Sequence, residues 1–251
     1  IGGRIAKRES LLVQTAEEMS ARYRLDIRVR SEVVHIDKEL KRVKVKDLTS
    51  GISYTESYDV LILSPGATPF RPEIKGLDTS KNIFTLRSIP DTDRIKQYIQ
   101  KYRPQHATVV GGGFIGLEMA ENLREQGLEV AVIEMGKQVL TPVDVEIAAY
   151  IHKHLRDNGV TLVLEKGVAA LSENGSVLHL TDGSQLKTDL VILSIGVQPE
   201  SKLASEAGLA LGIKGAIKVN DQFQTSDSSI YAIGDAIEIC EWITNTGSVI
   251  P

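Results

Sequence analysis

Residues 106–134 read HATVVGGGFIGLEMAENLREQGLEVAVIE, and this stretch decides the fold. It consists of a short apolar strand, a Gly-x-Gly-x-x-Gly turn, an amphipathic helix and a second strand that ends in an acid. The glycine pattern alone more often marks an ordinary loop, but this order of elements is typical of a βαβ unit that binds a dinucleotide. We therefore expect a dinucleotide site at the turn.

Each part of the pattern has a physical role. Gly111 lets the chain turn out of the strand, Gly113 lets the backbone approach a pyrophosphate, and Gly116 lets the helix pack against the sheet. The N-terminus of the helix directs free N–H groups at the phosphates. Glu134 follows the glycines by about 20 residues, where a carboxylate can accept the hydroxyl groups of an adenosine ribose.

Composition limits the classes of protein to consider. The chain has 251 residues, 42% of them hydrophobic and 25% charged, which suits one large or two modest globular domains. The net charge of −4 gives no electrostatic reason to expect nucleic acid or an acidic membrane surface as a partner. No apolar run approaches the roughly 18 residues of a membrane span, and no signal-peptide pattern is present. We expect a cytoplasmic protein.

Cysteine and histidine give little evidence of a metal or redox site. Cys240 is the one cysteine, so no internal disulfide or Cys-x-x-Cys pair can form, and such a residue is most often a small buried side chain. His152 and His154 lie two apart on a predicted helix and point in different directions. No cluster has zinc-ligand spacing, so we expect no metal.

Strands and helices alternate along the chain, which predicts an α/β fold with a parallel sheet. A proline-rich connector is expected at residues 69–76, and Thr15 and Glu18 form a capping box at the start of the first helix. The expected helices are residues 15–22, 88–102 and 144–158; the expected strands before the connector are 26–37, 41–48, 52–58 and 59–63, the first three as an antiparallel meander.

Two distant segments have closely similar sequences. Residues 59–69 (DVLILSPGATP) and 189–199 (DLVILSIGVQP) share six of eleven residues. Two core strands could resemble each other by chance, or a nucleotide-binding domain is duplicated. In a duplication, Gly111 lies 85 residues before Gly196, so the matching glycine lies 85 residues before Gly66 and thus upstream of Ile1. We expect a first dinucleotide-binding unit there.

With the fingerprint, the repeat and the sequence IYAIGDA at residues 230–236, the chain resembles the pyridine nucleotide–disulfide oxidoreductases along essentially its whole length. The sequences IGGRI (1–5), VQTAE (13–17) and TPVD (141–144) are similar to the branch of coenzyme A disulfide reductases, NADH oxidases and persulfide reductases. The resemblance implies two Rossmann-like domains, the first incomplete, with a small antiparallel β-meander. Residues 1–80 and 225–251 would form part of the FAD-binding domain, and residues 81–224 the NAD(P)H-binding domain.

The resemblance also implies roles for individual residues. Phe114 would gate the nicotinamide pocket or would simply pack at the helix start, and Glu118 would face the nicotinamide or be a solvated carboxylate. NADH is favoured over NADPH, because Glu134 would repel a 2′-phosphate that Lys137 could otherwise reach. The implied NAD(P)H-binding residues are Gly111, Gly112, Gly113, Phe114, Ile115, Gly116, Glu134 and Gly196, and the implied FAD-binding residues are Ser64, Gly66, Gly234 and Asp235.

The implied reaction passes a hydride from NADH to FAD and then electrons to a disulfide or persulfide such as coenzyme A disulfide. An NADH oxidase or peroxidase is an alternative, and a non-catalytic NAD-binding redox sensor is another. The redox cysteine is expected upstream of Ile1, and the intact protein is expected to be a homodimer through a further C-terminal domain. The 251 residues alone are expected to be inactive. Arg22 or Arg24 would touch a coenzyme A phosphate or would be solvated helix arginines.

Overall fold

A computed structural model describes residues 1–3, 5, 8–241, 243 and 246–249, so Arg4 of the opening motif lies outside the described residues. The chain divides into two compact units. Unit 1 comprises Ile1–Ala6 and Pro69–Gly196, and unit 2 comprises Lys7–Thr68 and Val197–Pro251. The chain thus passes between the units at Pro69 and after Gly196, whereas the sequence led us to expect changes near residues 81 and 225.

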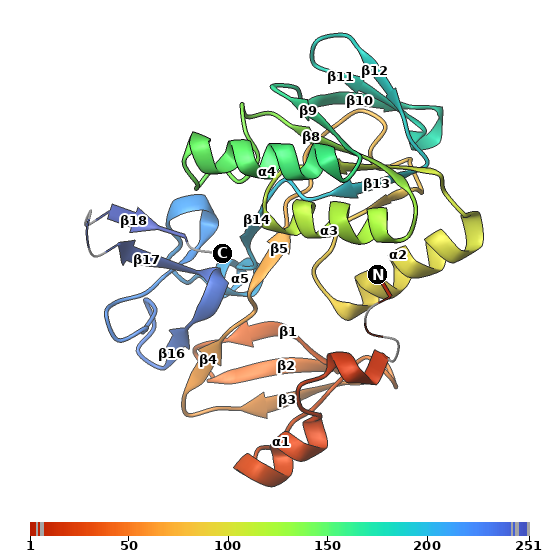
Figure 1. Ribbon diagram of the computed structural model, residues 1–251. Coiled ribbons are helices and arrows are strands. Elements are labelled where there is room, and N and C mark those ends of the chain that lie inside the picture. The colour runs from red at the N-terminus through yellow and green to blue at the C-terminus, as the bar shows by residue number, and fades with distance from the viewer. Residues whose placement is uncertain (4, 6–7, 242, 244–245, 250–251) are drawn as a thin grey trace. The chain divides into compact units, whose positions relative to one another are not determined.

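The core of unit 1 is a five-stranded sheet in which every neighbouring pair of strands is parallel (Figure 1). Parallel strands need crossover connections, which explains why helices alternate with strands in this part of the sequence. The predicted α/β fold is confirmed. In spatial order the strands are β6 (Ile83–Phe84), β13 (Leu190–Leu193), β7 (His106–Val110), β8 (Glu129–Glu134) and β9 (Val160–Leu164).

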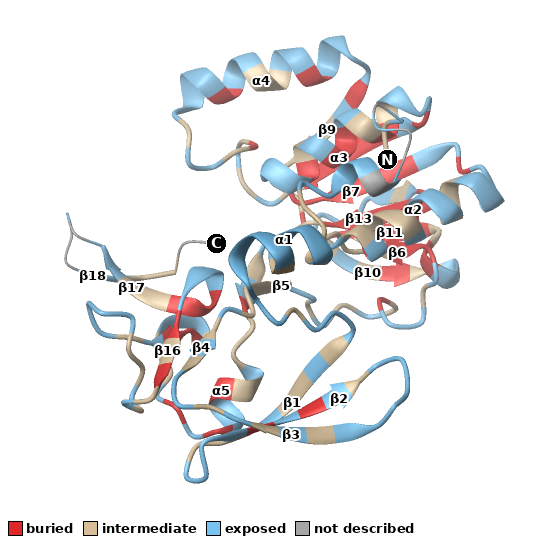
Figure 2. Cartoon of the chain, turned by 90° about the horizontal axis from the view of Figure 1, so that it is seen from below, coloured by how far each residue is buried: buried red, intermediate tan, exposed pale blue. Residues whose placement is uncertain are grey.

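Both faces of this sheet are covered. Val109 packs with side chains of the helices on one face, and the next residue, Val110, packs with the antiparallel strands on the other. Buried residues accordingly gather in the sheet and on the inner sides of the helices (Figure 2). The helices are α2 (Ile89–Tyr102), α3 (Phe114–Glu125) and α4 (Val145–Asp157); the antiparallel strands are β10 (Val168–Ser172), β11 (Val177–Leu180) and β12 (Gln185–Lys187), with the 3-10 turn η2 (Glu173–Gly175).

Unit 2 contains the predicted antiparallel meander and a short parallel pair. The meander is β1 (Ser31–Asp37), β2 (Arg42–Asp47) and β3 (Ser53–Ser57), and β4 (Leu61–Leu63) runs parallel to β16 (Ile230–Ala232). Its other elements are α1 (Ala16–Tyr23), α5 (Lys202–Glu206), β15 (Ile217–Lys218), β17 (Ile237–Glu241), β18 (Thr246–Ser248), η1 (Arg8–Leu11), η3 (Ile213–Gly215) and η4 (Gly234–Ala236). Among the described residues, no helix combines the length and apolar character that crossing a membrane requires.

The start of unit 2 confirms one local prediction and corrects another. Thr15 caps α1 and forms the capping box with Glu18. The strand expected from residue 26 begins only at Ser31, because Arg30 has a left-handed backbone (φ 54°) that an extended strand cannot include. Arg28, just before it, instead extends its side chain to Asp26 and Glu56.

The two repeated segments fold alike. Each forms a strand, then a turn at a glycine with positive φ (74° at Gly66 and 109° at Gly196), then the short strands β5 (Ala67–Pro69) and β14 (Val197–Pro199), which pair with each other. The bonds around this pair are reciprocal: Phe70 N donates to Gly196 O (2.9 Å), and Glu200 N donates to Gly66 O (3.0 Å). Equivalent residues therefore make equivalent bonds, which supports a duplication over chance similarity.

Packing explains the positions of the unit boundaries. Leu77 is buried in the same cluster as Leu171, and Lys75 forms a bridge with Ala170, so the chain joins unit 1 directly after Pro69. Residues after 197 pack on the meander, so they belong to unit 2; the shared cluster includes Ile36, Val43, Ala204, Ala207 and Leu209.

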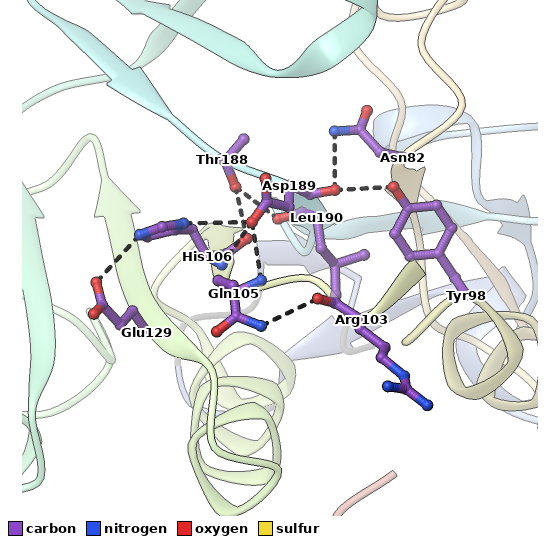
Figure 3. A network of polar contacts seen from close by, with 9 residues as sticks. All are labelled: Asn82, Tyr98, Arg103, Gln105, His106, Glu129, Thr188, Asp189 and Leu190. Carbon is purple, nitrogen blue, oxygen red and sulfur yellow. Dashed lines mark hydrogen bonds and ion pairs between the residues drawn. The ribbon is translucent and has the colours of Figure 1, made fainter. Parts of the chain in front are cut away.

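A polar network ties together the amino ends of β7 and β13 (Figure 3). The Asp189 carboxylate accepts hydrogen bonds from the backbone N–H groups of Gln105 and His106, both at 2.9 Å. The Asp189 carbonyl accepts from Tyr98 Oη at 3.0 Å and from Asn82 Nδ2 at 3.3 Å. This network lies at the end of the strands opposite to Gly111, so it holds the sheet together away from the candidate site.

Candidate functional site

The candidate site lies at the carboxyl end of the unit 1 sheet. From β7 the chain continues to β8 on one side, whereas β13 lies on the other side of β7. Such a reversal of strand order leaves a crevice in which α/β sheets bind their ligands. Gly111 follows β7, Ser194 follows β13, and Glu134 ends β8, so the sheet brings these three residues to one edge.

At two of the fingerprint positions, neighbouring backbone atoms leave room for no residue larger than glycine. Gly111 has φ 108°, and a Cβ atom there would lie 2.3 Å from the backbone oxygen of Ser194. A Cβ atom on Gly116 would lie 2.0 Å from the oxygen of Gly111. No side chain fits at either position, and the start of α3 is thereby held closely against the turn.

Gly113 is different because it faces open space. It is the N-cap of α3, a helix of 12 residues, and a Cβ atom on Gly113 would meet no atom within 4 Å. No side chain caps this helix end, so its first N–H groups can donate hydrogen bonds to an anionic ligand. Phe114 is 66% exposed and Ile115 is 45% exposed beside it. The residues present therefore fit a pyrophosphate.

The Glu134 carboxylate is fixed by two backbone groups. Its Oε2 accepts from Gly112 N and its Oε1 from Gly136 N, both at 2.7 Å. A carboxylate has about four lone-pair directions, so acceptor capacity remains for the hydroxyl groups of a ribose. Lys137 follows on the same loop and is exposed.

The loop after Glu134 is held at its far end by His152, which the sequence analysis did not assign to the site. Val139 is fully buried, and its backbone N–H donates to His152 Nε2 at 3.2 Å. Leu140 N donates to Gly112 O at 2.9 Å. Burial, and next the charge of Arg156, lower the pKa of His152 from its usual value. One signal was present in the sequence: His152 shares a helix face with Leu155, three residues later.

Ser194 is a second residue that the sequence analysis missed. Its hydroxyl lies 3.1 Å from both Val110 O and Gly111 O, so it can donate to either at the end of the fingerprint strand. The repeat contains the signal, because Ser194 occupies the same position as Ser64, which the resemblance implies is an FAD-binding residue.

Three further predicted residues of unit 1 line the same edge or its helix. Gly196 has φ 109° and open space where a Cβ would lie. Phe114 and Glu118 are exposed on α3, one turn apart. A role for Phe114 as a gate and for Glu118 toward a nicotinamide remains a proposal.

The predicted FAD-binding residues come together within unit 2. Because β4 and β16 are parallel, their carboxyl ends share one edge, where Ser64 and Gly66 follow β4 and Gly234 and Asp235 follow β16. Ser64 and Asp235 are exposed, and a Cβ on Gly234 would meet no atom within 4 Å. The unobstructed backbone at Gly234 and the exposed carboxylate of Asp235 fit part of a dinucleotide.

The remaining candidate residues are Arg22, Arg24 and Cys240, and the two arginines have roles local to α1. Arg22 lies over the ring of Tyr23, 5.2 Å from its centroid, and Arg24 has the left-handed backbone that ends α1. The expectation that Cys240 is buried is wrong, because it is exposed in the short hairpin of β17 and β18. In the part of the chain that the structure describes, no three His, Cys, Asp or Glu side chains are grouped to hold a metal ion.

Comparisons with a family model, with curated proteins and with solved structures all identify similar oxidoreductases. Residues 3–248 match the family "Pyridine nucleotide-disulphide oxidoreductase". The chain is 35% identical to an NADH oxidase of Methanocaldococcus jannaschii, covering 100% of this chain and 56% of that protein. It is 33% identical to a coenzyme A disulfide reductase of Staphylococcus haemolyticus, covering 94% and 52%. The crystal structure of reduced Bacillus anthracis CoADR-RHD superposes with a TM-score of 0.97 at 59% identity, covering 100% and 45%. The chain thus spans about half the length of these proteins.

Proposed function

The chain belongs to the pyridine nucleotide-disulphide oxidoreductase family, and we propose that unit 1 is the NADH-binding domain of an FAD-dependent oxidoreductase. Unit 2 would be part of its FAD-binding domain. The whole protein would pass a hydride from NADH to the flavin and electrons onward to a disulfide or persulfide such as coenzyme A disulfide. It would act as a homodimer.

The turn after β7 carries this proposal. Open space at Gly113, the uncapped start of α3 and the fixed Glu134 carboxylate together offer a pyrophosphate site and a ribose site. NADH is favoured because a 2′-phosphate would bring negative charge to Glu134. When bound, the nicotinamide would supply the hydride and the flavin would receive it. The protein's own residues bind and orient both groups.

The acceptor is the least constrained part of the proposal. The Staphylococcus haemolyticus relative reduces coenzyme A disulfide by its name, and the Methanocaldococcus jannaschii relative is named an NADH oxidase. The oxidase is therefore the second candidate. A sensor without catalysis is less favoured, because an NAD-binding module has no need of the open FAD-type edge at Asp235.

The nucleotide site is tested with Gly113→Ala. The added methyl group meets no protein atom, so the fold should tolerate it, but it fills the space that a pyrophosphate would approach. We expect the Kd for NADH to rise about tenfold or more, with an unfolding midpoint close to that of the wild type. Unchanged NADH affinity in the variant, or no NADH binding by the wild type, would contradict the proposal.

A matched variant tests the nucleotide preference. Glu134→Gln keeps an oxygen acceptor for Gly112 N or Gly136 N but removes the negative charge. We expect NADPH binding to improve relative to NADH binding. If the ratio of the two affinities stays the same, Glu134 does not set the preference.

The acceptor is tested on the longer protein. NADH consumption is measured with coenzyme A disulfide, polysulfide, hydrogen peroxide and oxygen in separate assays. A disulfide or persulfide reductase should consume NADH fastest with the sulfur acceptors. A rate that depends only on oxygen would favour the oxidase, and no reoxidation of the flavin by any acceptor would exclude both.

A further inference from the structure

His152 makes a contact that the proposed reaction does not explain. It is the half-buried histidine of α4, whereas His154 on the same helix is exposed. A backbone N–H can only donate, so the bond from Val139 N requires an unprotonated Nε2. His152 is therefore the neutral imidazole that carries its proton on Nδ1. A doubly protonated ring would bring two donors face to face and lose the bond.

The contact is connected to the nucleotide site through two further steps. The side chain of Val139 packs against Gly112, since Val139 Cγ1 lies 2.8 Å from the place where a Cβ on Gly112 would be. Gly112 in turn donates its N–H to Glu134 and accepts from Leu140 N. The loop of residues 135–143 is thus fixed to the fingerprint turn on one side and to α4 on the other.

We propose that His152 is a positioning residue of the nucleotide site, which holds this loop through Val139 and thereby keeps the Glu134 carboxylate in place for the ribose. The inference rests on the proposed function of unit 1. Protonation of His152 would release Val139 N, loosen the loop and weaken binding of the adenosine half of the dinucleotide. Nucleotide affinity should therefore fall as the pH falls through the titration of this histidine.

The surrounding charges agree with a histidine that stays neutral near pH 7. Burial disfavours the protonated ring, and the charge of Arg156 on α4 adds to this effect. The other charged groups on the neighbouring segments are Lys137 on the loop, Asp144 at the N-cap of α4 and Glu134 at the end of β8. Glu134 already accepts two backbone hydrogen bonds, from Gly112 and Gly136, which hold its carboxylate at the turn and not at His152.

The test measures binding of ADP-ribose by calorimetry between about pH 8 and pH 5. This probe contains the adenosine ribose and the pyrophosphate, and it is stable in acid, unlike NADH. For the wild type we expect the Kd to rise about fivefold on acidification, as for the loss of one hydrogen bond. His152→Gln offers a neutral acceptor at similar reach, so it should bind near the wild-type level at high pH and lose the pH dependence.

Two variants and one second readout complete the design. His152→Leu removes the acceptor, so at every pH it should bind with about the affinity of the acidified wild type, which is about fivefold weaker than the wild type at pH 8. His154→Gln on the same helix is the matched control and should keep the wild-type profile. Hydrogen exchange of the Val139 amide, compared among variants at one pH, should be faster in His152→Leu and unchanged in His154→Gln.

Two results would overturn the inference. One is a wild-type pH profile that survives in His152→Gln or disappears in His154→Gln. The other is a Val139 amide that exchanges equally in His152→Leu and in the wild type. If the wild type binds no ADP-ribose at any pH, the proposed function fails, whereas the exchange of Val139 still decides whether His152 holds the loop.

Discussion

The two copies of the repeated strand have similar sequences, but one copy is buried and the other is largely exposed. In β13, Leu190 and Ile192 are fully buried beneath helices of unit 1. Their equivalents flanking and within β4, Val60 and Ile62, are 58% and 59% exposed. β13 pairs with a strand on each side, whereas β4 pairs with β16 alone among the described residues.

The difference shows that a strand's own sequence does not decide its burial. An apolar strand is buried only when a neighbouring element covers it, and each exposed Val or Ile forgoes about 1.5–3 kcal/mol of burial free energy. In unit 1 the fingerprint strand β7 and helix α3 supply the cover. The first dinucleotide-binding unit expected from the repeat would supply the same cover for β4.

The polar positions of the repeat differ in the same way. Asp189 accepts two backbone N–H groups at the start of the fingerprint strand, and Ser194 donates to a carbonyl at its end. Their equivalents Asp59 and Ser64 are exposed and make no such side-chain hydrogen bonds with the described residues. In unit 1 the aspartate and the serine of the repeat thus form hydrogen bonds with the neighbouring strand β7, one at each of its ends. The comparison between the two copies can be tested at each of these positions.

The largest effect is expected at the turn that follows the fingerprint strand. Gly111→Ala combines an unfavourable backbone conformation with a contact of 2.3 Å to Ser194 O. We expect the free energy of unfolding of unit 1 to fall by about 2–5 kcal/mol. Urea unfolding combined with hydrogen exchange of β7 amides measures this loss.

Gly196→Ala is the control for that variant. It has a similar φ of 109° but no atom within 4 Å, so only the conformational cost of about 1–2 kcal/mol should remain. Equal losses in the two variants would mean that close packing against Ser194 does not contribute.

The second effect compares the two aspartates. Asp189→Ala removes the acceptor of Gln105 N and His106 N, and we expect a loss of about 1–2 kcal/mol. Asp59→Ala should cost less than about 0.5 kcal/mol, as is usual for an exposed side chain. Urea unfolding of both variants gives the comparison. A loss in Asp59→Ala as large as that in Asp189→Ala would show that the two copies are equally supported.

Local patterns made much of the fold predictable. The fingerprint unit depends on glycines, helix periodicity and a terminal acid within 29 residues, and α1 depends on its capping box at Thr15. The first meander strand was placed too early, because alternation of side chains does not reveal the left-handed backbone of Arg30. The unit boundaries depend on contacts such as that of Leu77 with Leu171, which are far apart in sequence.

The candidate site was predictable to the same extent. Gly111 and Glu134 belong to a local motif, and the structure brings them to one edge of the sheet. His152 was not assigned because its bond to Val139 joins a helix to a loop, and no motif specifies such a contact. Ser194 could have been found from its alignment with Ser64, since a duplicated residue suggests a duplicated bond.

The third effect concerns these serines. Ser194→Ala removes the donor to Val110 O or Gly111 O, and we expect a loss of about 1 kcal/mol. Ser64→Ala should change the stability of this chain by less than about 0.5 kcal/mol. In a longer protein with an upstream fingerprint strand, the two substitutions should cost the same. If Ser64→Ala remains silent there, the two nucleotide-binding domains are not equivalent at this position.

The smallest expected effect is on the pH dependence of stability. Burial would raise the pKa of Asp189, but hydrogen bonds from the His106 and Gln105 backbone and the nearby His106 ring lower it overall. A carboxyl group whose pKa is lower in the folded state stabilises the fold above its unfolded pKa of about 3.9, and this stabilisation is lost as the pH falls through the folded pKa. Because the Asp189 side chain is 48% exposed, solvent screens the contribution and it should be small.

Asp189→Asn isolates this charge effect, because the amide oxygen can still accept from the two backbone groups. Acid unfolding curves of the variant should therefore be flatter than those of the wild type below about pH 4, while stability near pH 7 changes little. Asp59→Asn, in the copy whose aspartate accepts no such backbone bonds from the described residues, should leave the acid part of the unfolding curve unchanged. An equal flattening by both variants would mean that the acid part of the unfolding curve depends on the overall charge of the chain and not on the hydrogen bonds that Asp189 accepts from Gln105 and His106.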